Sequence, residues 1–207
     1  MKRMKFTLFS VKNKSSFKNV KNLIKLFSDV DISIFHFNEI SEDMVHVVFN
    51  IKDEYIFGTK ISGNQLNMPM NQYINSFYDS TSGLLFIEYV NERYCDEVSQ
   101  YLKENNVDLQ RYQLTNEIML KTLTLYNGFI KKVELTDSSG EVFLFEVLSI
   151  DVLLDKISDE KTKILSLLML SNKNFISLTE AGIVSINNND LDYLTNFVRL
   201  FPYVENN

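Results

Sequence analysis

The sequence predicts an α+β fold in which mixed or mainly antiparallel sheets are packed by about five to seven helices. Strand-like runs separated by short polar breaks indicate hairpins over residues 32–61, 129–148 and 174–186. Apolar residues recur at helical spacing between these hairpins. The strands and helices follow one another irregularly, whereas a doubly wound parallel sheet requires regular alternation, so antiparallel sheets are favoured.

The length of 207 residues suits one large domain or two small ones. A break near Val107-Asp108 predicts an N-terminal domain over residues 1–108 and a C-terminal domain over residues 109–207, with one continuous domain as the alternative. Hydrophobic residues make up 45% of the chain and charged residues 23%, so there is enough apolar material for a packed core.

The first half is expected to begin with a strand and a basic helix that Ser15 or Ser16 caps. The expected strands cover residues 5–11, 32–40, 44–51, 55–61 and 84–90, with polar breaks at 41–43 and 52–54. Two further helices are expected, a short one over residues 71–78 and a longer one over residues 91–106, for which Asn91 is the N-cap.

The second half is expected to alternate short strands with helices. Thr115 or Asn116 can cap a helix that Asn127-Gly128 ends, because Gly readily adopts the left-handed conformation found there. The expected strands cover residues 110–114, 129–135, 141–148, 175–178 and 183–186. Two more helices are expected over residues 151–170 and 190–200, the first ending in a run that is apolar all round and therefore buried.

The chain has a single cysteine, Cys95, so an intrachain disulfide and a zinc site of several cysteines are excluded. Such low cysteine usage is typical of proteins in a reducing cytoplasm. The apolar stretch at residues 6–11 is too short for a signal peptide, and no stretch of 18 apolar residues is present. We therefore expect a cytoplasmic protein that does not span a membrane.

Positive charge gathers at the N-terminal end of an acidic chain. The formal net charge is −6, yet eight of the 21 basic residues lie within residues 1–25, before the first acidic residue. On an α-helix, the spacing from Lys14 to Lys25 places four lysines on one stripe. The residues predicted to bind a partner or a phosphate group, here called the basic segment, are Lys12, Lys14, Lys18, Lys21 and Lys25.

Several interpretations of the basic segment stay open. Rows of lysine can contact nucleic-acid phosphates, because such contacts depend on charge. An acidic partner protein, or an acidic surface of a second copy of the chain, would serve equally. A solvated surface without a ligand is the remaining alternative. The low isoelectric point, about 5.0, argues against nucleic acid.

Both histidines, His36 and His46, lie in one predicted hairpin. If Glu42-Asp43 is a two-residue turn, Glu39 lies opposite His46 and His36 lies opposite Phe49. A Glu–His pair can transfer a proton or contribute to a metal site, but no converging partners are evident, so ordinary strand histidines are favoured. Whether His36, Glu39 and His46 form a site stays open.

No catalytic residue, metal site or cofactor is predicted. Three acidic neighbours raise rather than lower the pKa of a thiol at Cys95. No phosphate-binding glycine pattern occurs. Asp137 and Glu146 resemble a nuclease carboxylate pair, but Leu148 stands where the lysine is needed.

The strand over residues 141–148 is largely apolar on both faces, so both faces should be covered, one of them by a partner or a second copy. We expect a non-catalytic accessory or adaptor subunit that binds protein within a larger prokaryotic assembly. Abundant Asn and a single Ala indicate an AT-rich prokaryotic genome. The alternative is a nucleic-acid-binding protein that uses the basic segment, within a DNA-processing or phage-defence system.

Overall fold

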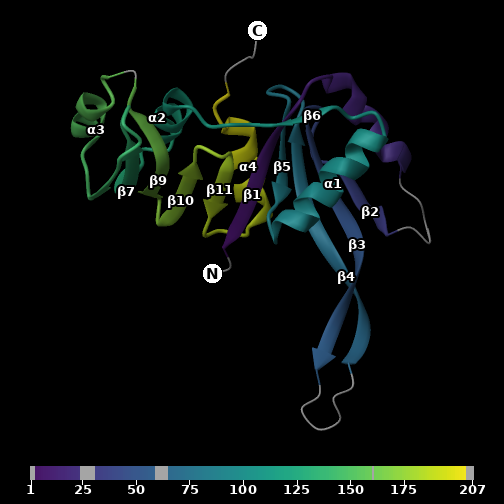
Figure 1. Ribbon diagram of the computed structural model, residues 1–207. Coiled ribbons are helices and arrows are strands. Elements are labelled where there is room, and N and C mark those ends of the chain that lie inside the picture. Colours follow the sequence, from purple (N-terminus) through teal and green to yellow (C-terminus); the bar gives the residue numbers. More distant parts are fainter. Residues whose placement is uncertain (1–2, 24–30, 59–64, 160, 204–207) are drawn as a thin grey trace. The chain divides into compact units, whose positions relative to one another are not determined.

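The computed structural model describes residues 3–23, 31–58, 65–159 and 161–203 (Figure 1). The chain divides into two compact units. Unit 1 contains the residues up to Ser10 and those from Gln110 onward, whereas unit 2 runs from Val11 to Leu109. Unit 1 is therefore built from two separate stretches of the sequence.

Unit 2 has an antiparallel sheet with the strand order β2-β3-β4-β5. Its strands are β2 (Ile32–Glu39), β3 (Met44–Gly58), β4 (Gln65–Asp79) and β5 (Leu84–Glu88), and its helices are the 3-10 helix η1 (Lys14–Leu23) and α1 (Glu92–Glu104). Helix α1 lies across the sheet (Figure 1). It begins where Asn91 Oδ1 accepts a hydrogen bond from Tyr94 N–H, and its Tyr101 ring contacts Phe49 edge-on, with 6.1 Å between centroids.

Strands β3 and β4 continue beyond the sheet as a two-stranded ribbon (Figure 1). β2 pairs with β3 only as far as Ile51, and β5 pairs with β4 only from Ser76. The expected break over residues 52–54 and the expected short helix over residues 71–78 are therefore wrong, because both segments lie within these strands. Pairing with a distant strand overrides the local polar signal.

Unit 1 has an antiparallel sheet with the strand order β1-β11-β10-β9-β7-β8. Its strands are β1 (Met4–Val11), β7 (Phe129–Thr136), β8 (Val142–Glu146), β9 (Lys163–Ser171), β10 (Asn174–Thr179) and β11 (Ile183–Ile186). The short strand β6 (Leu109–Arg111) pairs with β1 off this path. Its helices are α2 (Asn116–Leu125), α3 (Ile150–Lys156) and α4 (Leu191–Leu200).

The prediction of a helix over residues 151–170 is correct only for its first turns. Helix α3 ends at Lys156, and the apolar run that follows forms β9 between β10 and β7. A short apolar run reads equally as a buried helix or a buried strand when only periodicity is considered. In β9, Leu167 and Met169 are buried in the core, while Leu168 is half-buried on the opposite face.

The predicted fold class, an α+β fold packed by about five to seven helices, is also wrong. The described residues form eleven strands, mostly in antiparallel pairs, with four short α-helices and one 3-10 helix. The longest α-helix, α1, has 13 residues. Sheet therefore dominates, because two segments that read as helix are strands. Within the described ranges, no helix is long and apolar enough to cross a membrane.

Candidate functional site

The basic segment forms a different helix from the one its spacing suggests. Residues 14–23 form the 3-10 helix η1, which has three residues per turn. The spacing between Lys14, Lys18 and Lys21 therefore does not produce the single stripe of an α-helix. The side chain of Lys18 and the whole of Lys25 lie outside the described residues.

Three lysines of the basic segment contact acceptors within unit 2. Lys12 Nζ lies 3.3 Å from Asp108 Oδ2, and Lys21 Nζ lies 3.5 Å from Glu39 Oε1. Lys14 Nζ donates a hydrogen bond of 2.6 Å to the Thr81 carbonyl. These contacts reduce the positive field that the sequence suggests, although exposed pairs such as these open readily in water.

The hairpin of β2 and β3 has a different register from the predicted one. The amides of Ile40 and Ser41 both donate to the Met44 carbonyl, so the first strand has one extra residue just before the turn at residues 42–43. As a result Glu39 lies opposite Val45, and Asn38 lies opposite His46. A second register shift, between Ile34 and His36, places His36 opposite Val48.

The structure nevertheless brings the two histidines together and adds two residues that the sequence analysis missed. The His36 and His46 ring centroids are 6.1 Å apart. His46 Nε2 lies 3.0 Å from Asn75 Oδ1, and Asn75 Nδ2 donates to Glu88 Oε2 at 2.6 Å. No local pattern identifies Asn75 or Glu88, since they lie on β4 and β5 and reach His46 only through strand pairing.

This polar chain holds His46 rather than activating it. Because Asn75 uses its Nδ2 as a donor, its Oδ1 is an acceptor and His46 Nε2 carries the proton. Partial burial lowers the pKa of His46, which favours the neutral ring. Among the described residues, no group of three or more His, Cys, Asp or Glu side chains is placed to hold a metal ion.

The other chemical candidates are separated or enclosed. Asp137 Oδ1 accepts hydrogen bonds from Ser139 and Glu141 within the β7–β8 turn, whereas Glu146 lies opposite Lys132 at the far end of the hairpin. The thiol of Cys95, a residue of α1, is buried. The structure therefore does not assemble the carboxylate pair or expose the thiol.

Exposed apolar side chains concentrate at one end of unit 1. Seven of the seventeen large apolar side chains that are exposed in the described residues lie within residues 142–154, which marks a surface rather than a scatter. They are Val142, Phe143, Leu144, Val147, Ile150, Val152 and Leu154, and we call them the β8–α3 surface.

The β8–α3 surface includes a strand edge. β8 is the last strand of its sheet and pairs with β7 on one side. Leu144 lies opposite Glu134 on one face, and Phe143 lies opposite Leu135 on the other. Apolar side chains are thus exposed on both faces of a strand whose outer edge is the boundary of the sheet.

Helix α3 extends this surface beyond the strand. Ser149 Oγ accepts a hydrogen bond from Val152 N–H and caps the helix. Leu153 is completely buried and anchors the helix, whereas its neighbour Leu154 is 46% exposed. Ile150 and Val152 are 38% and 44% exposed, so the helix adds partly exposed apolar side chains to the surface.

No family model matches the sequence, and neither does any curated protein. What the chain does must therefore be inferred from its own residues. The β8–α3 surface is the candidate site that this geometry favours most, since exposed apolar side chains and a strand edge coincide there.

Proposed function

We propose that this chain acts by binding another protein through the β8–α3 surface, as an accessory or adaptor subunit. The observation that carries the proposal is that the edge strand β8 exposes apolar side chains on both of its faces. The Asn-rich, AT-rich coding favours a prokaryotic assembly as the setting.

Strand addition is the mode of binding that this edge favours. Soluble proteins usually protect an edge strand with charge, proline or a bulge. Residues 142–145 of β8 contain none of these, and the charged residues Glu141 and Glu146 stand only at the two ends. A partner strand would satisfy the outer backbone groups and cover Leu144 on one face and Phe143 on the other.

Nucleic-acid binding through the basic segment is the rival proposal. Phosphate groups would compete with Asp108 for Lys12 and with Glu39 for Lys21. Neutralising phosphates gives an affinity that falls steeply with salt, whereas an apolar strand interface responds weakly. Fluorescence anisotropy with DNA and RNA oligonucleotides at low and physiological salt therefore separates the two proposals.

Site-specific photo-cross-linking in the producing cell tests the protein-binding proposal. A photoreactive amino acid replaces Leu144 in one variant and Leu200, an equally exposed residue on α4, in the matched control. We expect a defined adduct from position 144, weakened by Val152→Glu in the same chain. Equal adducts from the two positions, or none from position 144, would contradict the proposal.

The mass of the adduct also identifies the kind of partner. An adduct of twice the chain mass indicates a second copy, and any other discrete mass indicates a different protein. Changing the described lysines Lys12, Lys14 and Lys21 to Glu should leave this adduct intact if the β8–α3 surface is the binding site. Loss of the adduct in that variant would instead assign the contact to the basic segment.

A further inference from the structure

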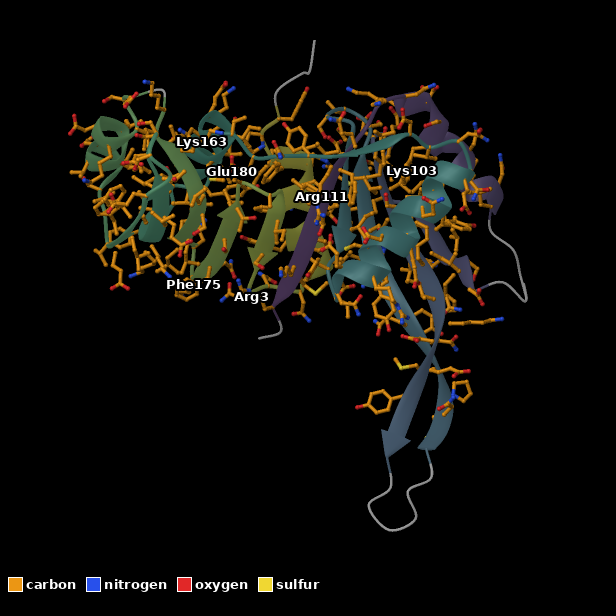
Figure 2. The ribbon with its side chains drawn as sticks, in the orientation of Figure 1. Arg3, Lys103, Arg111, Lys163, Phe175 and Glu180 are labelled. Atoms are coloured by element: carbon orange, nitrogen blue, oxygen red, sulfur yellow. The ribbon has the colours of Figure 1, made fainter. Side chains whose placement is uncertain are left out.

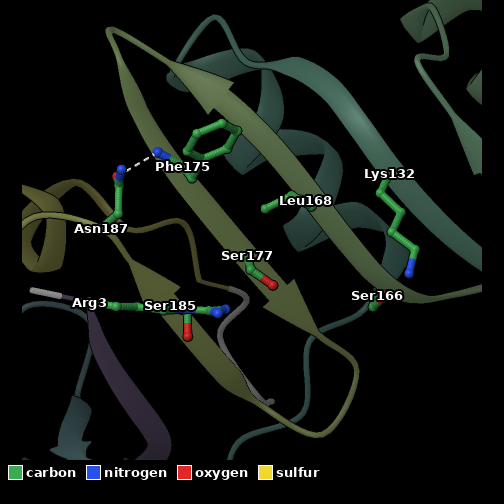
Figure 3. Close-up of a pocket in the computed structure, with 8 residues that line it drawn as sticks. All are labelled: Arg3, Lys132, Ser166, Leu168, Phe175, Ser177, Ser185 and Asn187. Atoms are coloured by element: carbon green, nitrogen blue, oxygen red, sulfur yellow. Dashed lines mark hydrogen bonds between the residues drawn. The ribbon is translucent and has the colours of Figure 1, made fainter. Parts of the chain in front are cut away.

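The sheet of unit 1 has a pocket of about 420 Å³ on the face opposite its buried core (Figure 3). Its lining residues are Arg3, Lys132, Ser166, Leu168, Phe175, Ser177, Ser185 and Asn187. All belong to unit 1. Arg3 immediately precedes β1 and Asn187 immediately follows β11, while the others lie on β7, β9, β10 and β11.

Strand register explains the hollow. Ser185 pairs with Ser177, Ser177 pairs with Leu168, and Leu168 pairs with Lys132, so these four residues form one row across the sheet. Side chains in such a row share one face. Two small hydroxyls at one end of the row leave a depression, and the longer side chains of Leu168 and Lys132 form its wall.

The floor of the pocket contains hydroxyls that lack partners. Ser185 is only 4% exposed, and within the described residues neither it nor Ser177 has a hydrogen-bond partner for its side chain. A polar group that enters the pocket can accept a hydrogen bond from the Ser185 hydroxyl.

The other polar groups are mostly donors. Asn187 Oδ1 accepts a hydrogen bond of 2.6 Å from Phe175 N–H, so its Nδ2 remains available as a donor. Arg3 extends past Ser185 in the view of Figure 3 and has no ion pair within the described chain. Lys132 lies at the other end and pairs with Glu134 at 3.3 Å. The Arg3 end is therefore the positive pole of the pocket.

An apolar wall accompanies this positive pole. The Phe175 ring is 43% exposed and stands beside Asn187, and Leu168 is half-buried next to it. Exposed aromatic rings next to convergent donors are typical of small-molecule sites, and the volume falls within the range of roughly 300–1,000 Å³ found for them.

We propose that this pocket binds a small organic anion. Its carboxylate or phosphate group contacts Arg3, Asn187 and the hydroxyl of Ser185, and its apolar body lies against Phe175 and Leu168. The guanidinium fork of Arg3 matches both oxyanions. The inference stands independently of protein binding by the β8–α3 surface, because the two sites share no residue.

Calorimetric titration of the whole chain tests this proposal with four probes: phenyl phosphate, benzoate, inorganic phosphate and benzyl alcohol. We expect phenyl phosphate or benzoate to bind more tightly than inorganic phosphate, which lacks the apolar body, and than benzyl alcohol, which lacks the charge. The stronger of the first two probes distinguishes a phosphate site from a carboxylate site. Failure of both to bind at millimolar concentration would overturn the proposal.

Two pocket variants and one matched control locate the binding. Arg3→Gln should weaken the better probe by roughly tenfold or more, because a charge-assisted pair is lost, and Ser185→Val should weaken it less. Lys163→Gln removes the same charge from β9, at the end of the strands away from Arg3 (Figure 2), and should leave affinity unchanged. Equal affinity in Arg3→Gln, with its fold verified by circular dichroism, would refute the assignment.

Discussion

Asp53 Oδ2 lies 2.7 Å from Arg93 Nη2, which joins strand β3 to helix α1 at the place where the ribbon leaves the sheet of unit 2. The Tyr94 hydroxyl donates to the same carboxylate oxygen. This hydrogen bond, followed by the contact with Arg93, lowers the pKa of Asp53 to about 2. The base of the ribbon is therefore held by an ionised carboxylate.

The contact of Asp53 with Arg93 and Tyr94 should make the stability of the protein depend on pH in the acidic range. Its folded-state pKa lies below the unfolded value of about 3.9, so its stabilisation is present above pH 4 and disappears as the pH falls through 2. Because Arg93 is largely exposed, we expect Asp53→Asn to lower the free energy of unfolding by about 0.5–1 kcal/mol at pH 7. Urea unfolding from pH 2 to 7 measures this. A difference between wild type and variant that is as large at pH 2 as at pH 7 would contradict the assignment.

Gly182 should not tolerate a side chain. Its φ is +75°, and a Cβ there would lie 1.9 Å from the Tyr112 carbonyl oxygen. We expect Gly182→Ala to cost about 3 kcal/mol or more, because backbone must move. The control is Gly140→Ala, where φ is +83° but nothing lies within 4 Å, so only backbone strain of about 1–2 kcal/mol is expected. Thermal unfolding of both variants measures the two losses of stability, and equal losses would contradict the clash predicted at Gly182.

Helix α3 offers a pair of adjacent leucines with opposite roles. Leu153→Ala should destabilise the protein by about 2–5 kcal/mol, because this side chain is completely buried. Leu154→Ala should change stability by no more than about 0.5 kcal/mol, since that side chain is exposed. Chemical unfolding gives both values. Similar losses would mean that α3 is oriented differently from the arrangement described.

His46 should titrate below its ordinary pKa. Burial lowers the pKa, while the hydrogen bond with Asn75 raises it, so Asn75→Ala should lower the pKa further. Proton NMR titration of the imidazole signals measures this, and His36→Gln identifies which signal is His46. An unchanged or higher pKa in Asn75→Ala would show that the hydrogen bond is absent.

The same shift predicts how stability responds to mild acid. The folded state favours neutral His46. The contribution of this neutral ring to the free energy of unfolding is therefore complete above pH 6.5 and is lost as the pH falls through the lowered folded-state pKa. Wild type should therefore be more stable at pH 7.5 than at pH 5.5. The variant His46→Gln should show a smaller difference, and an equal difference would place the effect on another group.

Local signals in the sequence identified the ends of several elements. Asn91 was predicted as one helix cap and Thr115 or Asn116 as another. Asn91 and Thr115 each accept a hydrogen bond from the backbone three residues later. Asn127-Gly128 was predicted to end a helix, and α2 does end at Leu125, but the residue with the left-handed conformation is Asn127 (φ 46°) and not Gly128. These features depend on residues close in the chain, which is why sequence alone reveals them.

The errors concern features that distant residues decide. Residues 163–171 are a strand because β7 and β10 pair with them, and residues 71–78 are a strand because β3 does. The position of Glu39 depended on one inserted residue near Ile40, which no composition signal marks. The pocket joins Arg3 to Asn187, from opposite ends of the sequence, so only the folded sheet reveals it.

The discontinuity of unit 1 has a consequence for how the chain folds as it is synthesised. β1 pairs with β11 from Met4–Ile186 to Thr7–Ile183. This pairing cannot form until β11, near the end of the chain, has been synthesised. Unit 2 is continuous and has all its residues once Leu109 has emerged from the ribosome. The β1 edge stays available to incorrect partners throughout that interval, so slow translation of the second half would favour aggregation before unit 1 closes.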